Sequence, residues 1–372
     1  MGRPKKVAAP NALNVEVAKA GRLMPSGVTL LDLACSDSLD GFCTAGHGVN
    51  FIGDRDAGKT AVALASQGET FHRFGDEFGY DLYDAENAFG FDVASLWGAR
   101  FAKALNVVTV PEDRAYAIEP LGLKIIESLK SGKPRFIVID SMDRLRPVKE
   151  YDGIVDIADG KSGFNTARAK ANRLFFNTIL PRIAETRSFL IYLSQATCNM
   201  GYGAMFQPKV RGGGTSLGFN AHIELWFSQG PAIKVGNVKV GHWVFAKTAR
   251  SKVNGKKRDV TFPILPAYGV DDTRANIEWL AEEGVIGKAA EKKDGGDDGG
   301  KYDTAEEDGK KKAPKVYDLN PIGIEYVGKK PYLFVEQNGF TQKVVEAVAS
   351  KWAENERGYI EKALDGRKGR YE

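Results

Sequence analysis

One segment constrains the fold of this chain more than any other, and it runs from Gly53 to Thr60 with the sequence GDRDAGKT. It follows the apolar stretch 48–52, which we expect to be a buried strand, and precedes 61–66, a run of good helix formers. Strand, glycine-rich turn and helix together form the context of a phosphate-binding loop. Backbone N–H groups of such a turn point at the phosphates, and the helix N-terminus adds a favourable dipole. The segment therefore predicts an α/β fold that binds a nucleoside triphosphate, and we expect ATP.

Individual roles follow from this placement. We expect Lys59 to reach the β- and γ-phosphates and the Thr60 hydroxyl to ligate Mg²⁺. A second Mg²⁺ contact is expected from Asp140, which ends the apolar segment 135–140, because the carboxyl ends of parallel strands line the ligand crevice. The alternative is that Asp140 merely caps the next helix. Taken together, the predicted nucleotide contacts are Gly53, Asp54, Arg55, Asp56, Ala57, Gly58, Lys59, Thr60, Ala61 and Asp140.

Hydrolysis of the triphosphate also needs a residue that positions or activates water. Glu86 stands just past the strand-like segment 80–84 and has the right chemistry. On the residues alone, a solvated loop acid is an equally good interpretation of Glu86.

The order of these motifs resembles that of RecA-type recombinases, particularly the shorter phage versions of the UvsX kind. The resemblance covers about 26–290, and the segments that carry it are SGVTLLD at 26–32, YDAENA at 83–88, IVIDS at 137–141 and IYLSQ at 191–195. It implies a RecA-like P-loop ATPase core with a mostly parallel central sheet flanked by helices, plus a small C-terminal α/β unit. The resemblance also implies that Glu86 activates water and that Gln195 senses the γ-phosphate and moves the DNA loop behind it.

This resemblance further implies contact with a neighbouring subunit. A pair of lysines in the family reaches the neighbour's ATP; Lys247 matches the first, but Ala249 stands at the second position. Arg250 or Lys252 is the expected substitute. Lys247 as a plain solvated strand residue is the alternative.

Two loops bind DNA in this family, and the resemblance places them here at about 147–164 and 196–215. The second is glycine-rich and basic, and a loop of this length inside a compact domain is usually functional or disordered. Basic side chains would neutralise phosphates, apolar ones would separate or stack on bases, and glycines would let the backbone approach the strand. The predicted DNA contacts are Arg168, Met200, Phe206, Lys209, Arg211, Gly213 and Gly214.

Composition divides the 372 residues into unequal parts. We expect a flexible basic arm over 1–21, the ATPase core over 22–290, a charged linker over 291–315 that buries too little apolar surface to order itself, and a C-terminal unit over 316–372. In that unit, 323–327 and 332–336 suggest a hairpin, and apolar residues on one face between Val344 and Trp352 suggest an amphipathic helix after it. The unit is expected to gate duplex DNA or to bind a partner.

The functional expectation is an ATP-dependent recombinase that forms a helical filament on single-stranded DNA and pairs it with duplex DNA. A RecA-fold hexameric helicase and a regulatory RecA-like ATPase are the alternatives. Single-strand-binding and mediator proteins are the expected further partners. Because no apolar run approaches about 18 residues, we expect a cytoplasmic protein in a bacterial cell or phage-infected host. The three cysteines show no zinc-like pairing, and a net charge of +4 does not by itself indicate nucleic acid.

Overall fold

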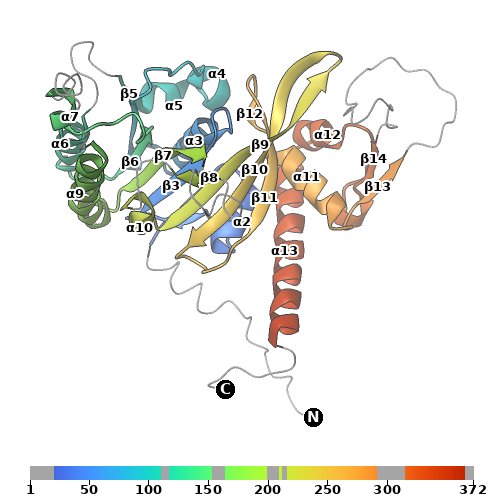
Figure 1. Ribbon diagram of the computed structural model, residues 1–372. Coiled ribbons are helices and arrows are strands. Elements are labelled where there is room, and N and C mark those ends of the chain that lie inside the picture. Colours follow the sequence, from blue (N-terminus) through green and yellow to red (C-terminus); the bar gives the residue numbers. More distant parts are fainter. Residues whose placement is uncertain are drawn as a thin grey trace.

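A computed structural model describes residues 21–109, 117–152, 164–198, 209–211, 216–290 and 315–364. Its centre is a ten-stranded sheet in the order β12-β11-β10-β9-β3-β7-β6-β4-β5, with β8 paired to β7 off this path (Figure 1). The strands are β3 (Gly48–Gly53), β4 (Gly79–Asp84), β5 (Leu105–Thr109), β6 (Arg135–Asp140), β7 (Phe189–Cys198), β8 (Lys209–Arg211), β9 (Ile223–Val235), β10 (Val238–Ser251), β11 (Asp259–Leu265) and β12 (Gly269–Val270).

The sheet is mixed. From β9 through β3, β7, β6 and β4 to β5 all neighbours on the main path pair in parallel, as predicted for the strands around the phosphate-binding loop. From β9 outward to β12 the pairing is antiparallel. Strand β3 lies between two parallel neighbours and every one of its residues is buried, which explains its nearly continuous apolar sequence.

Helices cover both faces of this sheet. In the core these are α2 (Thr29–Ser36), α3 (Lys59–Phe74), α4 (Val93–Trp97), α5 (Ala99–Ala104), α6 (Ile118–Leu129), α7 (Val148–Asp152), α9 (Phe164–Glu185) and α10 (Ser216–Asn220), with a 3-10 turn over Gly75–Glu77. A two-stranded ribbon pairs β1 (Leu23–Met24) with β2 (Cys43–Thr44). Within the described ranges, no helix has the length and apolar character needed to cross a bilayer.

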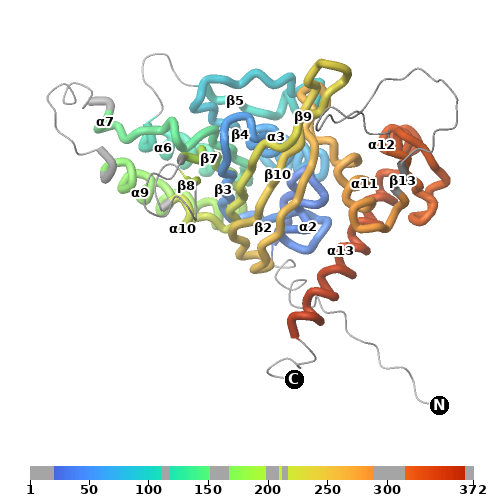
Figure 2. The backbone as a smooth tube through the Cα atoms, turned by 45° about the vertical axis from the view of Figure 1, so that its right-hand side comes forward, coloured from blue at the N-terminus to red at the C-terminus, as the bar shows by residue number. Residues whose placement is uncertain are grey.

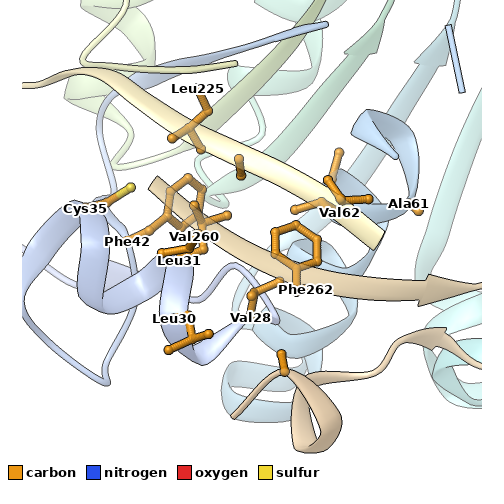
Figure 3. Packing of buried hydrophobic residues seen from close by; sticks show 14 of the residues in the cluster. Val28, Leu30, Leu31, Cys35, Phe42, Ala61, Val62, Leu225, Val260 and Phe262 are labelled. Carbon is orange, nitrogen blue, oxygen red and sulfur yellow. The ribbon is translucent and has the colours of Figure 1, made fainter. Parts of the chain in front are cut away.

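Two hydrophobic clusters hold these layers together. One lies between the sheet and helices α2 and α3, and Figure 3 shows Leu31, Val62 and Phe262 converging there. The other joins the opposite face to α6 and α9 through residues such as Ile125 and Phe176. Each fully buried side chain of this size stabilises the fold by roughly 1.5–3 kcal/mol relative to exposure. The parallel strands are therefore fixed from both sides, which holds the ends of β3, β6 and β7 in position.

The C-terminal part has its own three-stranded sheet. It contains β13 (Gly287–Ala290), β14 (Lys315–Asp318) and β15 (Val327–Gly328), with helices α11 (Asp272–Glu282), α12 (Pro331–Gln337) and α13 (Thr341–Leu364) and a 3-10 turn over Asn320–Ile322. Ala290 pairs with Lys315, so the two strands that flank the predicted linker are antiparallel neighbours. The residues between them lie outside the described residues, as does the N-terminal arm up to residue 20.

The predicted hairpin in this part is wrong. Residues 332–336 belong to helix α12, and 323–327 contribute only Val327 to a strand. A short apolar run does not distinguish a strand from a buried helix turn, and here Pro331 at the first helical position favours the helix. The amphipathic helix after it is confirmed, because Val344, Val348 and Trp352 are buried on one face of α13.

Helix α13 runs along the core and its last turns project from the body (Figure 2). A charged cluster fastens it. Glu356 accepts bonds from Arg258 Nε at 2.6 Å and Nη2 at 2.7 Å, and Lys256 Nζ lies 2.9 Å from the same carboxylate. Lys256 also donates to Asp37 at the end of α2. The C-terminal helix is thereby tied to two separate parts of the ATPase core.

Candidate nucleotide-binding site

The predicted phosphate-binding loop lies between the end of β3 at Gly53 and the start of α3 at Lys59. Gly58 caps the helix with a φ of 85°, a left-handed conformation that side chains rarely adopt. A Cβ atom there would also lie 2.6 Å from Ile264 Cδ1, so a larger residue would have to push the Ile264 side chain aside. Strand, turn and helix thus form the arrangement that the sequence predicted.

Lys59 folds back over this loop. Its Nζ donates to the carbonyl oxygens of Gly53 at 3.0 Å and Asp54 at 2.6 Å. Burial lowers the pKa of Lys59, while the carboxylates of Asp140 and Glu86 act in the opposite direction. The ammonium is therefore held at the mouth of the loop, where a phosphate would compete with the two carbonyls for it.

Asp140, at the end of β6, contacts Thr60, in the first turn of α3. The Thr60 hydroxyl donates to Asp140 Oδ2 at 2.6 Å, although the two residues are 80 positions apart. Burial raises the pKa of Asp140 to about 6, and the bond from Thr60 partly counters it. A hydroxyl and a carboxylate are hard oxygen donors of the kind Mg²⁺ prefers, and this ion commonly takes one or two protein ligands with phosphates and waters completing its shell. The two side chains fit such an ion.

Glu86 lies near the predicted phosphate-binding loop and beside β7, the strand that leads to the second predicted DNA loop. Its Oε1 accepts from Ser141 Oγ at 2.8 Å and from Gln195 Nε2 at 3.0 Å. Arg144 lies 4.0 Å from the same oxygen. The structure therefore brings together Lys59, Thr60, Glu86, Asp140 and Gln195, which the sequence had placed on four separate segments.

Two residues near Gln195 were missed from the sequence. Asp143 Oδ2 accepts from the Gln195 backbone N–H at 2.5 Å, and burial raises the pKa of Asp143. Arg144 approaches Glu86. Their only sequence signal was position, because they come three and four residues after Asp140 in the turn that leaves β6.

The three basic side chains predicted to contact DNA each interact with other residues of the protein. Arg168 donates to the Met142 carbonyl at 3.2 Å and to that of Asp143 at 2.8 Å. Arg211 donates to Glu224 at 2.7 Å and to Asn50 at 3.3 Å.

Lys209 forms an ion pair with Asp54 of the phosphate-binding loop. The remaining predicted DNA contacts lie outside the described residues, namely Met200, Phe206, Gly213 and Gly214.

Lys247 lies apart from this group. It is exposed on β10, on the face of the sheet opposite the buried side chains of Val244, Ala246 and Thr248. The pairing with β9 shifts register between Thr248 and Arg250, so that Arg250 stands opposite Glu224. This irregularity makes Ala249 an extra residue and places Arg250 on the same face as Lys247.

Comparison with known proteins identifies a family for this chain. A family model described as the RecA N-terminal domain matches residues 11–271. The chain is 30% identical over 281 residues to Protein RecA of Lactobacillus johnsonii, covering 74% of this chain and 71% of that protein. It is 24% identical over 290 residues to a plasmid Protein RecA of Lactococcus lactis, covering 77% and 79% of the two chains. The family match and the assembled nucleotide site lead to one conclusion: this chain belongs to the RecA family.

Proposed function

We propose that this protein is an ATP-dependent DNA recombinase that assembles as a filament on single-stranded DNA and promotes homologous pairing and strand exchange. The observation that carries the proposal is the 3.0 Å bond from Gln195 to Glu86. It joins the residue suited to activating water to the strand that leads directly into the glycine-rich loop. In a DNA-dependent ATPase, such a bond would couple ATP hydrolysis at Glu86 to the loop that contacts DNA.

The site residues divide the chemistry of ATP hydrolysis between them. We propose that Lys59 and the loop amides bind the β- and γ-phosphates, and that Thr60 and Asp140 hold Mg²⁺, with Gly53–Ala61 forming the cradle. When bound, Mg²⁺ neutralises charge on the transferred phosphoryl group. Glu86 accepts hydrogen bonds at one carboxylate oxygen, which orients the carboxylate toward a water that attacks the γ-phosphate.

We propose that Gln195 couples the nucleotide site to the DNA-contacting residues. Because its side chain bonds Glu86 and its backbone bonds Asp143, we propose that a change in the charge beside Glu86 alters the contacts of β7 at Gln195. Ligands that favour the same conformation of this strand increase each other's affinity by linkage. We propose that ATP and DNA are such a pair, with Arg168, Lys209, Arg211, Met200, Phe206, Gly213 and Gly214 as the DNA-contacting set.

We propose that ATP lies between neighbouring subunits of the filament. A head-to-tail polymer needs two different surfaces, one of which bears the phosphate-binding loop. Lys247 and Arg250 share the outer face of β10 and are suited to the other surface, with Arg250 taking the place of the family's second lysine. The register shift at Ala249 supports this substitution.

We further propose a place in the phage UvsX-like branch, working in the cytoplasm of a bacterial or phage-infected cell with single-strand-binding and mediator proteins. Identities of 24–30% to the cellular and plasmid relatives suit a divergent branch. For organisation we propose an arm over 1–21, a core over 22–290 whose last strand, β13, pairs with the C-terminal unit, a linker over 291–315 and a duplex-gating unit over 316–372. Limited proteolysis with and without duplex DNA tests these boundaries.

Electron microscopy of the protein with single-stranded DNA and a nonhydrolysable ATP analogue tests the central proposal. Helical filaments that depend on both ligands are the expected result. Closed rings with duplex unwinding and no strand exchange would favour a hexameric helicase, and particles that leave the DNA unprotected would favour a regulatory ATPase.

A further inference from the structure

The short strand β8 turns its basic side chains toward the ATPase core. It pairs antiparallel with β7, placing Lys209 opposite Cys198 and Arg211 opposite Ala196. Residues two apart on a strand share a face, and both long side chains reach toward β3. Arg211 bonds Asn50 on β3 and Glu224 on β9, while Lys209 reaches past the end of β3 to Asp54.

Asp54 is an unfavourable residue for its position. It follows Gly53 in the loop expected to hold a triphosphate, and a carboxylate there repels the incoming phosphates. Three further carboxylates, those of Glu86, Asp140 and Asp143, influence the same lysine, Lys59. Asp140 is bonded by Thr60, and the other two have an arginine within 4.0 Å.

Lys209 is the positively charged partner of Asp54. The two residues are 155 positions apart, and their side chains are only half exposed, at 49% and 40%. A cation drawn from the strand after Gln195 thus offsets the acidic group in the phosphate-binding loop.

We propose that Lys209 belongs to the nucleotide site, where it neutralises Asp54 and makes the affinity for a nucleoside triphosphate depend on the position of β8. This inference rests on the proposed function of the loop as an ATP site. Whatever moves β8 away from the loop leaves Asp54 uncompensated and weakens nucleotide binding. By reciprocity, a bound triphosphate changes the free energy of moving β8.

The test is direct nucleotide binding by the full-length protein without DNA, using a fluorescent ATP analogue with Mg²⁺ at low ionic strength. Lys209→Met is expected to weaken binding by about two- to fivefold, the range for a partly exposed ion pair. Asp54→Asn is expected to tighten binding, because it removes a negative charge beside the phosphates. Lys362→Met, on the projecting end of α13, is the matched control for loss of a positive charge and should bind as the wild type does.

The double variant Lys209→Met/Asp54→Asn tests whether Lys209 acts through its ion pair with Asp54 or merely adds positive charge to the protein. Without Asp54, the Lys209 ammonium has no partner to keep it at the loop, and water and salt screen it. Lys209→Met is therefore expected to have a much smaller effect in the Asp54→Asn background. Equal effects in both backgrounds, or an unchanged affinity for Lys209→Met alone, would overturn the proposal.

These outcomes are separable from failure of the proposed function. A wild-type protein that binds no nucleotide refutes the ATP site itself. If the wild type binds nucleotide, and Lys209→Met leaves that affinity unchanged while lowering the salt slope of DNA binding by about one, Lys209 is a DNA contact only and the inference is refuted. Circular dichroism of each variant confirms that the fold is retained.

Discussion

Replacing Glu356 by alanine should release the C-terminal helix from the core. The carboxylate of Glu356 is among the least exposed in the C-terminal part, with 10% of its side chain accessible, and it receives two bonds from Arg258 and one from Lys256. Removing one partner of a buried charged pair costs about 3–5 kcal/mol. Here Arg258 and Lys256 retain 29% and 24% exposure, and Lys256 keeps Asp37, so both cations regain some solvation. We therefore expect a loss of about 2–3 kcal/mol.

Urea denaturation followed by tryptophan fluorescence measures this loss, because Trp352 on α13 packs against Trp279 on α11. Hydrogen exchange across α13 should accelerate in parallel. Glu354→Ala is the matched control, since Glu354 is 71% exposed and pairs with Lys351 three positions earlier on the same helix. That variant should lose less than about 0.5 kcal/mol. Equal losses of unfolding free energy in the two variants would refute the role of Glu356 in holding α13 to the core.

The same carboxylate predicts a dependence on pH. Burial alone raises the pKa of Glu356, but the bonds from Arg258 and Lys256 outweigh burial and leave the pKa below its ordinary value. A lowered folded-state pKa contributes stability that is complete above the unfolded pKa, about 4.3, and is lost as the pH falls through the folded value. The difference in stability between wild type and Glu356→Ala should therefore shrink in acid, and a difference that grows in acid would contradict this assignment.

Three further predictions concern the nucleotide site. Lys59→Ala should abolish nucleotide binding and filament assembly together, and normal DNA-dependent hydrolysis in that variant would refute the site. Glu86→Gln should keep ATP and DNA bound while blocking turnover, because an amide cannot accept a proton from water; wild-type turnover, measured as phosphate release, would return Glu86 to a solvated loop acid. Because the pKa of Asp140 is raised to about 6, the carboxyl becomes protonated below that pH, and Mg²⁺-dependent nucleotide binding should weaken as the pH falls through this value. Asp140→Asn should bind weakly at all pH values and flatten that profile, so a profile unchanged in the variant would assign the titration to another group.

Local sequence was sufficient for the phosphate-binding loop and not for its surroundings. Gly58 and Lys59 could be predicted because strand, turn and helix are contiguous and their chemistry is local. Glu86 and Gln195 were found only through resemblance to a family, since residues 109 positions apart have no local signal for their hydrogen bond.

The orientation of the basic residues could not be predicted for the same reason. Lys209 and Arg211 were predicted to neutralise DNA phosphates from a glycine-rich loop, but each pairs with an acid elsewhere in the chain, Lys209 with Asp54 of the phosphate-binding loop and Arg211 with Glu224 of β9. The position of Arg250 depends on a register shift in β10, and one extra residue reverses which face every later side chain occupies. In contrast, the helix at 331–337 did have a local signal, because Pro331 stands at its first position and the apolar run 332–335 does not alternate as a half-buried strand would.

The pairing of Ala290 with Lys315 also bears on how this protein can be altered. Ala290 and Lys315 are paired neighbours in the C-terminal sheet, so a connection between them has little distance to cover. Each halving or doubling of a flexible connection changes its closure free energy by only about 0.6 kcal/mol. Residues 291–314 thus mark a natural insertion point, where evolution or an engineer can exchange sequence, attach a reporter or graft a binding module while β13, β14 and the ATPase core keep their register.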